Sequence, residues 1–297
     1  MTLTHVITGF LGVGKTTTLE HLIKQKPNNE KWAVLLNEFG ETGLDALMLA
    51  SPDVVIKQVP GGCLCCVTQM PFQVMLNQLI RFDDPDRIFI EPSGLGHPDE
   101  IVKILKQDQY KKLLDVQPVV TLIDPRHLNN SRHRGHEIYT RQLAVADVFV
   151  ANKMDLASEQ DKQAFSDLLA EHKRSGFIVE KGQLPLSCLK QDKESESQYR
   201  LLKKASLNQP FFTQTLMLNK DDIWDARALE IYFQSLDVLR AKGVVFSLQG
   251  ALLINAALGE VSIKQVDRPK ESPRLELIDY QAIDLGTIKA QMESLKL

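Results

Sequence analysis

Three of the four cysteines lie within four positions, at Cys63, Cys65 and Cys66, directly after a pair of glycines. Thiolates this close together suit a metal ion or a redox pair, and a chance cluster is the third interpretation. The glycines let the backbone bend, so that two or three sulfurs can converge on one ion, with a further ligand from elsewhere. Thiolates with a carboxylate partner favour Zn²⁺ or another divalent transition metal over Mg²⁺.

A second motif, "GFLGVGKT" at residues 9–16, matches the phosphate-binding pattern G-x-x-x-x-G-K-[ST]. It follows a predicted strand and begins a predicted helix, so its N–H groups and the helix N-terminus would surround one phosphate chain. Lys15 is predicted to reach the β- and γ-phosphates as a catalytic residue, and the Thr16 hydroxyl to bind Mg²⁺. The predicted nucleotide contacts of this segment are Gly9, Phe10, Leu11, Gly12, Val13, Gly14, Lys15, Thr16 and Thr17.

A third motif, N-K-x-D, follows an apolar run and comprises Asn152, Lys153 and Asp155. A carboxylate in this place can accept hydrogen bonds from the N1–H and 2-amino donors of guanine, which adenine lacks, so Asp155 predicts selectivity for GTP. The aliphatic stem of Lys153 can pack over the base. Further along the chain, a loop amide at Ser187 is predicted to contact the guanine O6.

The stretch "RIFIEPSGLGHP" completes the predicted nucleotide site. Glu91, at the end of an apolar run, is expected to face Mg²⁺ through water as a further catalytic residue. The Gly94 N–H is expected to contact the γ-phosphate, so that this loop responds to hydrolysis. Of the nearby histidines, His97 is interpreted as a turn or capping residue. A solvated basic loop is expected to hold His127, His133 and His136.

In type and order, these motifs resemble those of the CobW-type metallochaperone GTPases. The stretches that carry the resemblance are "GFLGVGKTT", "NEFGETGLD", "GGCLCC", "EPSGLGHP" and "NKMD". The segments "NEKWAVLLNEFGE" and "PGGCLCCVTQMPFQV" are most similar to the YeiR branch of the family, which is described as zinc-binding GTPases. The resemblance covers the nucleotide domain densely and is looser after Gln191.

The resemblance implies a protein that binds GTP with Mg²⁺, binds zinc or a related metal, hydrolyses GTP and passes the metal to a client metalloprotein. It also implies self-association in several members. By this resemblance Glu41 joins the three cysteines as a zinc ligand, and Glu38 lies near Mg²⁺ or the attacking water as a catalytic residue. The chain departs from some YeiR-type members because no histidine follows His172.

Two other functions remain open from the residues. A thiol-redox sensor would join two cysteines in a regulatory disulfide and use GTP only to stabilise the fold. A small-molecule kinase would transfer the γ-phosphate to a metabolite, although N-K-x-D indicates a protein that reads guanine.

The elements that must position these motifs follow from the hydrophobic pattern. Apolar runs at residues 5–8, 32–37, 86–91, 119–124 and 147–153 alternate with helical patterns. Runs that are apolar throughout are typical of strands buried on both faces. They predict an α/β fold, namely a P-loop GTPase domain with a mostly parallel sheet covered by helices.

Three parts are predicted along the chain: the GTPase domain at 1–190, a polar linker at 191–210 and a smaller CobW-type α+β domain at 211–297. In the last part, a helix is expected to present Leu229, Tyr232, Leu236 and Leu239 on one face and to stop at Gly243. Several strands and a short final helix complete this domain.

Composition excludes some classes of function. The 297 residues are 43% hydrophobic, enough for a large core, and the net charge of −3 gives no reason to expect a nucleic-acid partner. No run approaches the roughly twenty apolar residues that cross a bilayer, so no membrane role is predicted. Four cysteines and no recognisable secretion signal predict the reducing cytoplasm.

Overall fold

The computed structural model describes residues 1–37, 49, 51, 53–59, 69–130, 137–189, 212–257, 260–266, 272–279 and 281–297. The chain divides into two compact units, Met1–Leu207 and Asn208–Leu297. The predicted linker lies outside the described residues, as do the cysteine motif, Glu38 and Glu41. Within the described part of the chain, no helix has the length and apolar character needed to cross a membrane.

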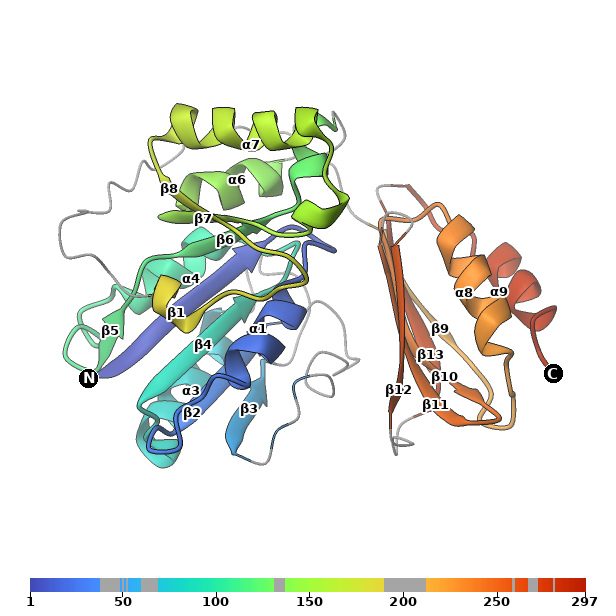
Figure 1. Ribbon diagram of the computed structural model, residues 1–297. Coiled ribbons are helices and arrows are strands. Elements are labelled where there is room, and N and C mark those ends of the chain that lie inside the picture. The colour runs from blue at the N-terminus through green and yellow to red at the C-terminus, as the bar shows by residue number, and fades with distance from the viewer. Residues whose placement is uncertain are drawn as a thin grey trace. The chain divides into compact units, whose positions relative to one another are not determined.

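The first unit is built on a parallel sheet (Figure 1). Its strands are β1 (Thr2–Gly9), β2 (Trp32–Asn37), β3 (Val54–Gln58), β4 (Arg87–Pro92), β5 (Leu114–Val116), β6 (Val120–Ile123), β7 (Val148–Ala151) and β8 (Ser175–Ile178). They lie in the order β3-β2-β4-β1-β6-β7-β8. The short strand β5 pairs with the first half of β1, and β6 pairs with the second half of β1 on the same side. All these pairings are parallel, so the loops that follow the strands meet at one carboxyl edge, as the sequence predicts.

Helices cover both faces of this sheet (Figure 1). They are α1 (Lys15–Ile23), α3 (Gln69–Gln78) with the π-helical turn η1 (Leu79–Asp83), α4 (Pro98–Leu105), α6 (Glu137–Val145) and α7 (Glu159–His172). Short 3₁₀ turns follow three strands: η2 (Pro125–Asn129), η3 (Met154–Leu156) and η4 (Leu186–Leu189). On one face, Phe72 and Leu76 of α3 and Ile101 of α4 pack with the strand residues Val6 and Ile90.

The burial pattern explains which strands the sequence predicts well. Every residue of β2 and β4 is buried, because each of these strands has a neighbour on both sides and helices on both faces. The edge strand β8 is mostly exposed, and its residues form no continuous apolar run. The hydrophobic pattern misses three strands: the two edge strands β3 and β8, and the three-residue β5.

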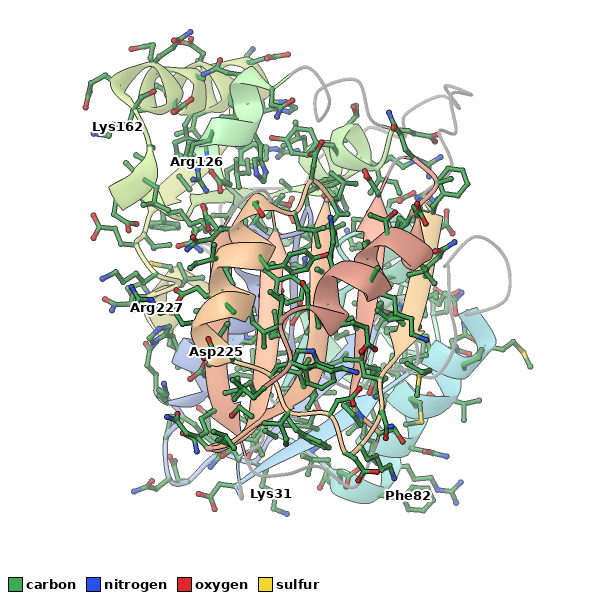
Figure 2. The ribbon with its side chains drawn as sticks, turned by 90° about the vertical axis from the view of Figure 1, so that its right-hand side faces the viewer. Lys31, Phe82, Arg126, Lys162, Asp225 and Arg227 are labelled. Carbon is green, nitrogen blue, oxygen red and sulfur yellow. The ribbon has the colours of Figure 1, made fainter. Side chains whose placement is uncertain are left out.

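The second unit is an antiparallel sheet with helices on one face (Figure 1). Its elements are β9 (Phe212–Met217), α8 (Ala226–Ser235), β10 (Arg240–Ser247), β11 (Gly250–Ala257), β12 (Glu260–Val266), β13 (Arg274–Asp279) and α9 (Leu285–Glu293), with strand order β12-β11-β10-β13-β9. Trp224, Leu229, Phe233 and Met292 pack with the apolar strand residues. Asp225, labelled in Figure 2 at the start of α8, caps that helix by accepting a hydrogen bond from the Ala228 N–H at 2.7 Å.

The predicted stop of the α8 helix is wrong. The helix ends at Ser235, Leu236 takes an extended conformation, and Gly243 lies in the middle of β10. β10 pairs with β11 on one side and with β13 on the other. Hydrogen bonding to two neighbouring strands fixes this segment as a strand, although the spacing of the preceding leucines suits a helix. Gly243 allows β13 to approach β10 closely, because a Cβ at this position would lie 2.1 Å from the Arg274 carbonyl oxygen.

Substitution of Gly243 tests this packing. In Gly243→Ala, the added methyl group meets a backbone oxygen that is fixed in the sheet, so we expect the free energy of unfolding to fall by at least about 2 kcal/mol. The matched control is Gly286→Ala in the first turn of α9, where a Cβ comes no closer than 3.2 Å to the Asp284 side chain. Urea unfolding followed by Trp224 fluorescence measures both, and equal effects would contradict the prediction.

Candidate nucleotide site

The phosphate-loop motif connects β1 to α1 at the carboxyl edge of the sheet. Gly14 is the N-cap of α1 and has a φ of 96°, which residues with side chains rarely adopt. A Cβ there would also lie 2.5 Å from Asn152 Nδ2. The first turn of α1 holds no acidic residue. The start of α1 therefore has neither a capping side chain at its N-cap nor an acidic residue in its first turn, which suits an anion at the positive end of the helix.

Lys15 lies over this loop. Its side chain is buried, and Nζ donates to the Phe10 carbonyl oxygen at 3.1 Å. The Thr18 hydroxyl donates to the Gly14 carbonyl oxygen at 2.9 Å, which stabilises the start of α1. A buried ammonium group above a turn of backbone N–H groups provides positive charge for a phosphate chain.

The predicted Mg²⁺ and γ-phosphate residues lie against this loop. Thr16 Oγ1 donates to Glu91 Oε1 at 3.3 Å, and Glu91 is buried at the end of β4. A Cβ at Gly94 would lie 3.0 Å from Lys15 Nζ. The structure thus brings Lys15, Thr16, Glu91 and Gly94 together. A hydroxyl and a carboxylate are the hard oxygen ligands that fit Mg²⁺.

Asn152 joins three segments of the site. Its Nδ2 donates to the Val13 carbonyl oxygen at 2.9 Å, and its Oδ1 accepts from the Gly182 N–H at 2.9 Å. The side chain is buried, so both bonds are shielded from water. The phosphate loop, the N-K-x-D motif and the loop after β8 are thereby held by one amide. The loop after β8 was not predicted from the motifs to belong to the site. Gly182, in the stretch "EKG", is the sequence feature that could have indicated it.

Lys153 and Asp155 follow in the turn after β7. Lys153 takes a left-handed conformation, with φ of 62°, and its Nζ lies 3.7 Å from Asp124 Oδ2. Asp155 is exposed in η3. Asp155 and Lys153 thus follow directly on Asn152, which contacts the phosphate loop.

Asp124 is a second residue that motif reasoning missed. It ends the β6 run, is fully buried, and accepts hydrogen bonds from Arg126 Nε at 2.9 Å and Nη2 at 2.5 Å (Arg126 is labelled in Figure 2). Burial alone raises the pKa of Asp124, but the Arg126 hydrogen bonds and the nearby positive charges bring it below its ordinary value. Its negative charge is therefore retained, which holds the Lys153 ammonium group beside it.

The segment that contains Ser187 is held elsewhere. Gln25, beyond the C-terminal end of α1, donates to the Leu184 carbonyl oxygen and accepts from the Leu186 N–H, both at 2.9 Å. The length of α1 separates this end from the phosphate loop by about 14 Å. The structure therefore brings Gly182 next to Asn152 and ties the residues just before Ser187 to the far end of α1.

The structure shows the positions of two histidines, His97 and His127, whose roles were predicted from the sequence. His97 is at the N-cap of α4, but its side chain does not cap the helix, and burial lowers its pKa. The expected solvated loop is wrong for His127, which is buried in η2 with Nε2 3.8 Å from Asp124 Oδ2. The reason is that η2 packs under α7, and the imidazole approaches the carboxylate. His133 and His136 lie outside the described residues.

The predicted metal ligands Glu41, Cys63, Cys65 and Cys66, together with Glu38, also lie outside the described residues. Among the residues that the structure describes, no three His, Cys, Asp or Glu side chains form a group that could hold a metal ion. The ends of the two flanking strands are described. β2 ends at Asn37 and pairs with β3, and the Val59 N–H donates to the Leu36 carbonyl oxygen at 2.8 Å. Both ligand-bearing segments thus begin at neighbouring strands of the carboxyl edge.

Together, the parallel sheet, the glycine-capped helix and the lysine-covered loop define a P-loop nucleotide-binding domain. The chain belongs to the CobW/HypB/UreG family, whose nucleotide-binding domain matches residues 3–180. The family resemblance predicted from the motifs is therefore confirmed.

Several characterised proteins are similar to this chain. The chain is 34% identical to the zinc chaperone YeiR of Escherichia coli K12, over an alignment of 324 residues that covers 100% of this chain and 99% of the relative. It is 31% identical to the zinc chaperone CobW of Pseudomonas aeruginosa over 218 residues, 62% of this chain and 58% of that one. A solved structure of Zn(II)-bound YjiA GTPase from E. coli aligns with 100% of this chain and 99% of its own, at 22% identity and a TM-score of 0.49.

Removal of the Asn152 amide tests its bridging role. Asn152→Ala leaves the Val13 carbonyl oxygen and the Gly182 N–H without this partner, so we expect the free energy of unfolding to fall by about 2–4 kcal/mol. The matched control, Asn129→Ala, removes one exposed bond to Asp161 Oδ1 and is expected to change it by less than about 1 kcal/mol. Urea unfolding of nucleotide-free protein gives both values. A small loss in Asn152→Ala would show that the three segments hold together without it.

Proposed function

We propose that this chain is a GTP-hydrolysing zinc chaperone, in which metal binding near the first switch segment is coupled to the state of the nucleotide. One observation carries the proposal. The two segments that contain the predicted metal ligands begin at the neighbouring strands β2 and β3, and β2 pairs with β4, whose Glu91 contacts Thr16 of the phosphate loop. A metal bound between these segments is next to the strand that carries the nucleotide site.

The described residues supply the nucleotide half of this function. The phosphate-loop N–H groups and Lys15 bind the phosphates, and the Gly94 N–H meets the γ-phosphate. Thr16 and Glu91 are the residues that would hold Mg²⁺, Glu91 through water. When bound, Mg²⁺ neutralises charge on the β- and γ-phosphate oxygens. Glu38 or Glu91 orients the attacking water.

Guanine recognition uses Asn152, Lys153 and Asp155. Asp155 accepts from the two guanine donors, and the Lys153 stem packs over the base while its ammonium group stays beside Asp124. A P-loop kinase has no need of this guanine-specific set.

The metal half rests on the cysteine motif and on the relatives. Cys63, Cys65 and Cys66 with Glu41 make a thiolate and carboxylate ligand set suited to Zn²⁺ as cargo. The names of the YeiR and CobW relatives support a chaperone of zinc. Zinc at these ligands orders the segment that begins after Asn37, and loss of the γ-phosphate releases it for transfer to a client metalloprotein.

The coupling is tested by GTP turnover with and without added Zn²⁺, under anaerobic conditions and without a histidine tag. We expect Zn²⁺ to raise the release of inorganic phosphate several-fold in the wild-type protein and to have no effect in Cys65→Ser. Cys188→Ser is the matched control, because Cys188 is a half-buried thiol outside the motif and the response should persist. If the wild-type protein binds no Zn²⁺ and hydrolyses GTP at the same rate as Cys65→Ser, the coupling is refuted. An oxidised cysteine pair in metal-free protein would favour the redox sensor.

Nucleotide selectivity is tested at Asp155. Asp155→Ala removes two charge-assisted hydrogen bonds to guanine, so we expect the affinity for GTP to fall roughly 10- to 100-fold and the weak affinity for ATP to stay unchanged. Asp167→Ala, an exposed aspartate of α7, is the control. Titration of the wild-type protein and both variants with fluorescent analogues of GTP and ATP measures the dissociation constants. An equal loss for both nucleotides would argue against guanine recognition by Asp155.

A further inference from the structure

Helix α6 contacts the nucleotide site although no sequence motif includes it. Tyr139 packs edge-on against Phe10 of the phosphate loop, with ring centroids 5.8 Å apart. Gln142, three residues later on the same helix face, donates from Nε2 to the Gly94 carbonyl oxygen at 2.9 Å. α6 therefore reaches both the phosphate loop and the loop after β4.

The peptide unit between Gly94 and Leu95 is held at both ends. Gln142 binds its carbonyl oxygen, and its N–H donates to Ser93 Oγ at 3.3 Å. The Gly96 N–H closes the turn on the Ser93 carbonyl oxygen at 2.9 Å. Because a peptide unit is planar, binding both of its ends sets the orientation of the Gly94 backbone, which lies against Lys15.

Two features indicate that Gln142 does more than fill the core. The side chain is 1% exposed, and its Oε1 has no hydrogen-bond partner among the described residues. A buried amide with one unpartnered end is unfavourable compared with an apolar side chain of similar shape. The helix is also anchored on both sides of this contact, because the Thr121 hydroxyl donates to the Gln142 carbonyl oxygen and Arg141 lies 3.6 Å from Asp99 of α4.

We propose that Gln142 is a positioning residue. By holding the Gly94–Leu95 peptide it sets the Gly94 backbone, so that the Gly94 N–H, which belongs to the preceding peptide unit, receives the γ-phosphate, and α6 thereby sets how well the protein distinguishes GTP from GDP. The inference rests on the proposed function in one respect, the assignment of Gly94 to the γ-phosphate. GDP lacks that phosphate, so its affinity does not depend on the orientation of this peptide.

The test compares affinity for a non-hydrolysable GTP analogue with affinity for GDP. Gln142→Met keeps an unbranched side chain of similar length but cannot donate, and we expect it to lower the analogue-to-GDP affinity ratio about tenfold with GDP affinity unchanged. Gln142→Glu places a carboxylate against the Gly94 carbonyl oxygen, and we expect a larger loss. Ser93→Ala releases the other end of the same peptide unit and should lower the ratio in the same direction.

Gln265→Glu is the matched control. It makes the same change in a side-chain amide that donates to a backbone carbonyl oxygen, that of Gln249, in the second unit, and should leave the ratio unchanged. An unchanged ratio in the Gln142 and Ser93 variants, or equal losses for both nucleotides, would overturn the proposal. Neither measurement requires zinc or turnover. A wild-type protein that binds no guanine nucleotide would instead mean that the proposed function has failed.

Discussion

The nucleotide site depends on one buried side chain, the carboxamide of Asn152. An asparagine amide offers a donor and an acceptor in one plane, and here each end meets a backbone group of a different loop. Val13 and Gly182 are 169 positions apart in the chain, yet the same amide sets the distance between their backbones. Gly14 is constrained by the same contact, because any side chain there would occupy the position of the amide nitrogen.

Around this contact, the parallel sheet turns sequence motifs into a site. Strands β1, β4 and β7 end at one edge, so the loops that follow them are neighbours whatever their separation in sequence. Asp124 extends the arrangement by keeping a negative charge beside Lys153 in a buried setting. The candidate binding side chains are thus carried by short loops, and the rigidity comes from strands that are buried at every position.

Much of this site can be predicted from sequence, for a physical reason. Phosphate binding needs a particular backbone conformation, and the glycines and lysine that allow it are local in the chain. Contacts between distant segments leave no such pattern: Gln142 reads as an ordinary helix residue, and Asp124 as the end of an apolar run. The Gly243 error has the same origin, because a glycine after a leucine-rich helix looks like a stop until its pairing with β13 is known.

The neighbouring ends of β2 and β3 have a consequence for binding strength. Adjacent strands in a sheet are about 4.8 Å apart, and the hydrogen bond from Val59 to Leu36 keeps that spacing up to the last residues before each segment departs. An ion that takes ligands from both segments therefore closes a ring whose ends already meet. The entropic cost of bringing the two strand ends together is met when the sheet folds and not when the ion binds. For the proposed zinc site, strand pairing would thus raise the effective concentration of the ligands of one segment near those of the other.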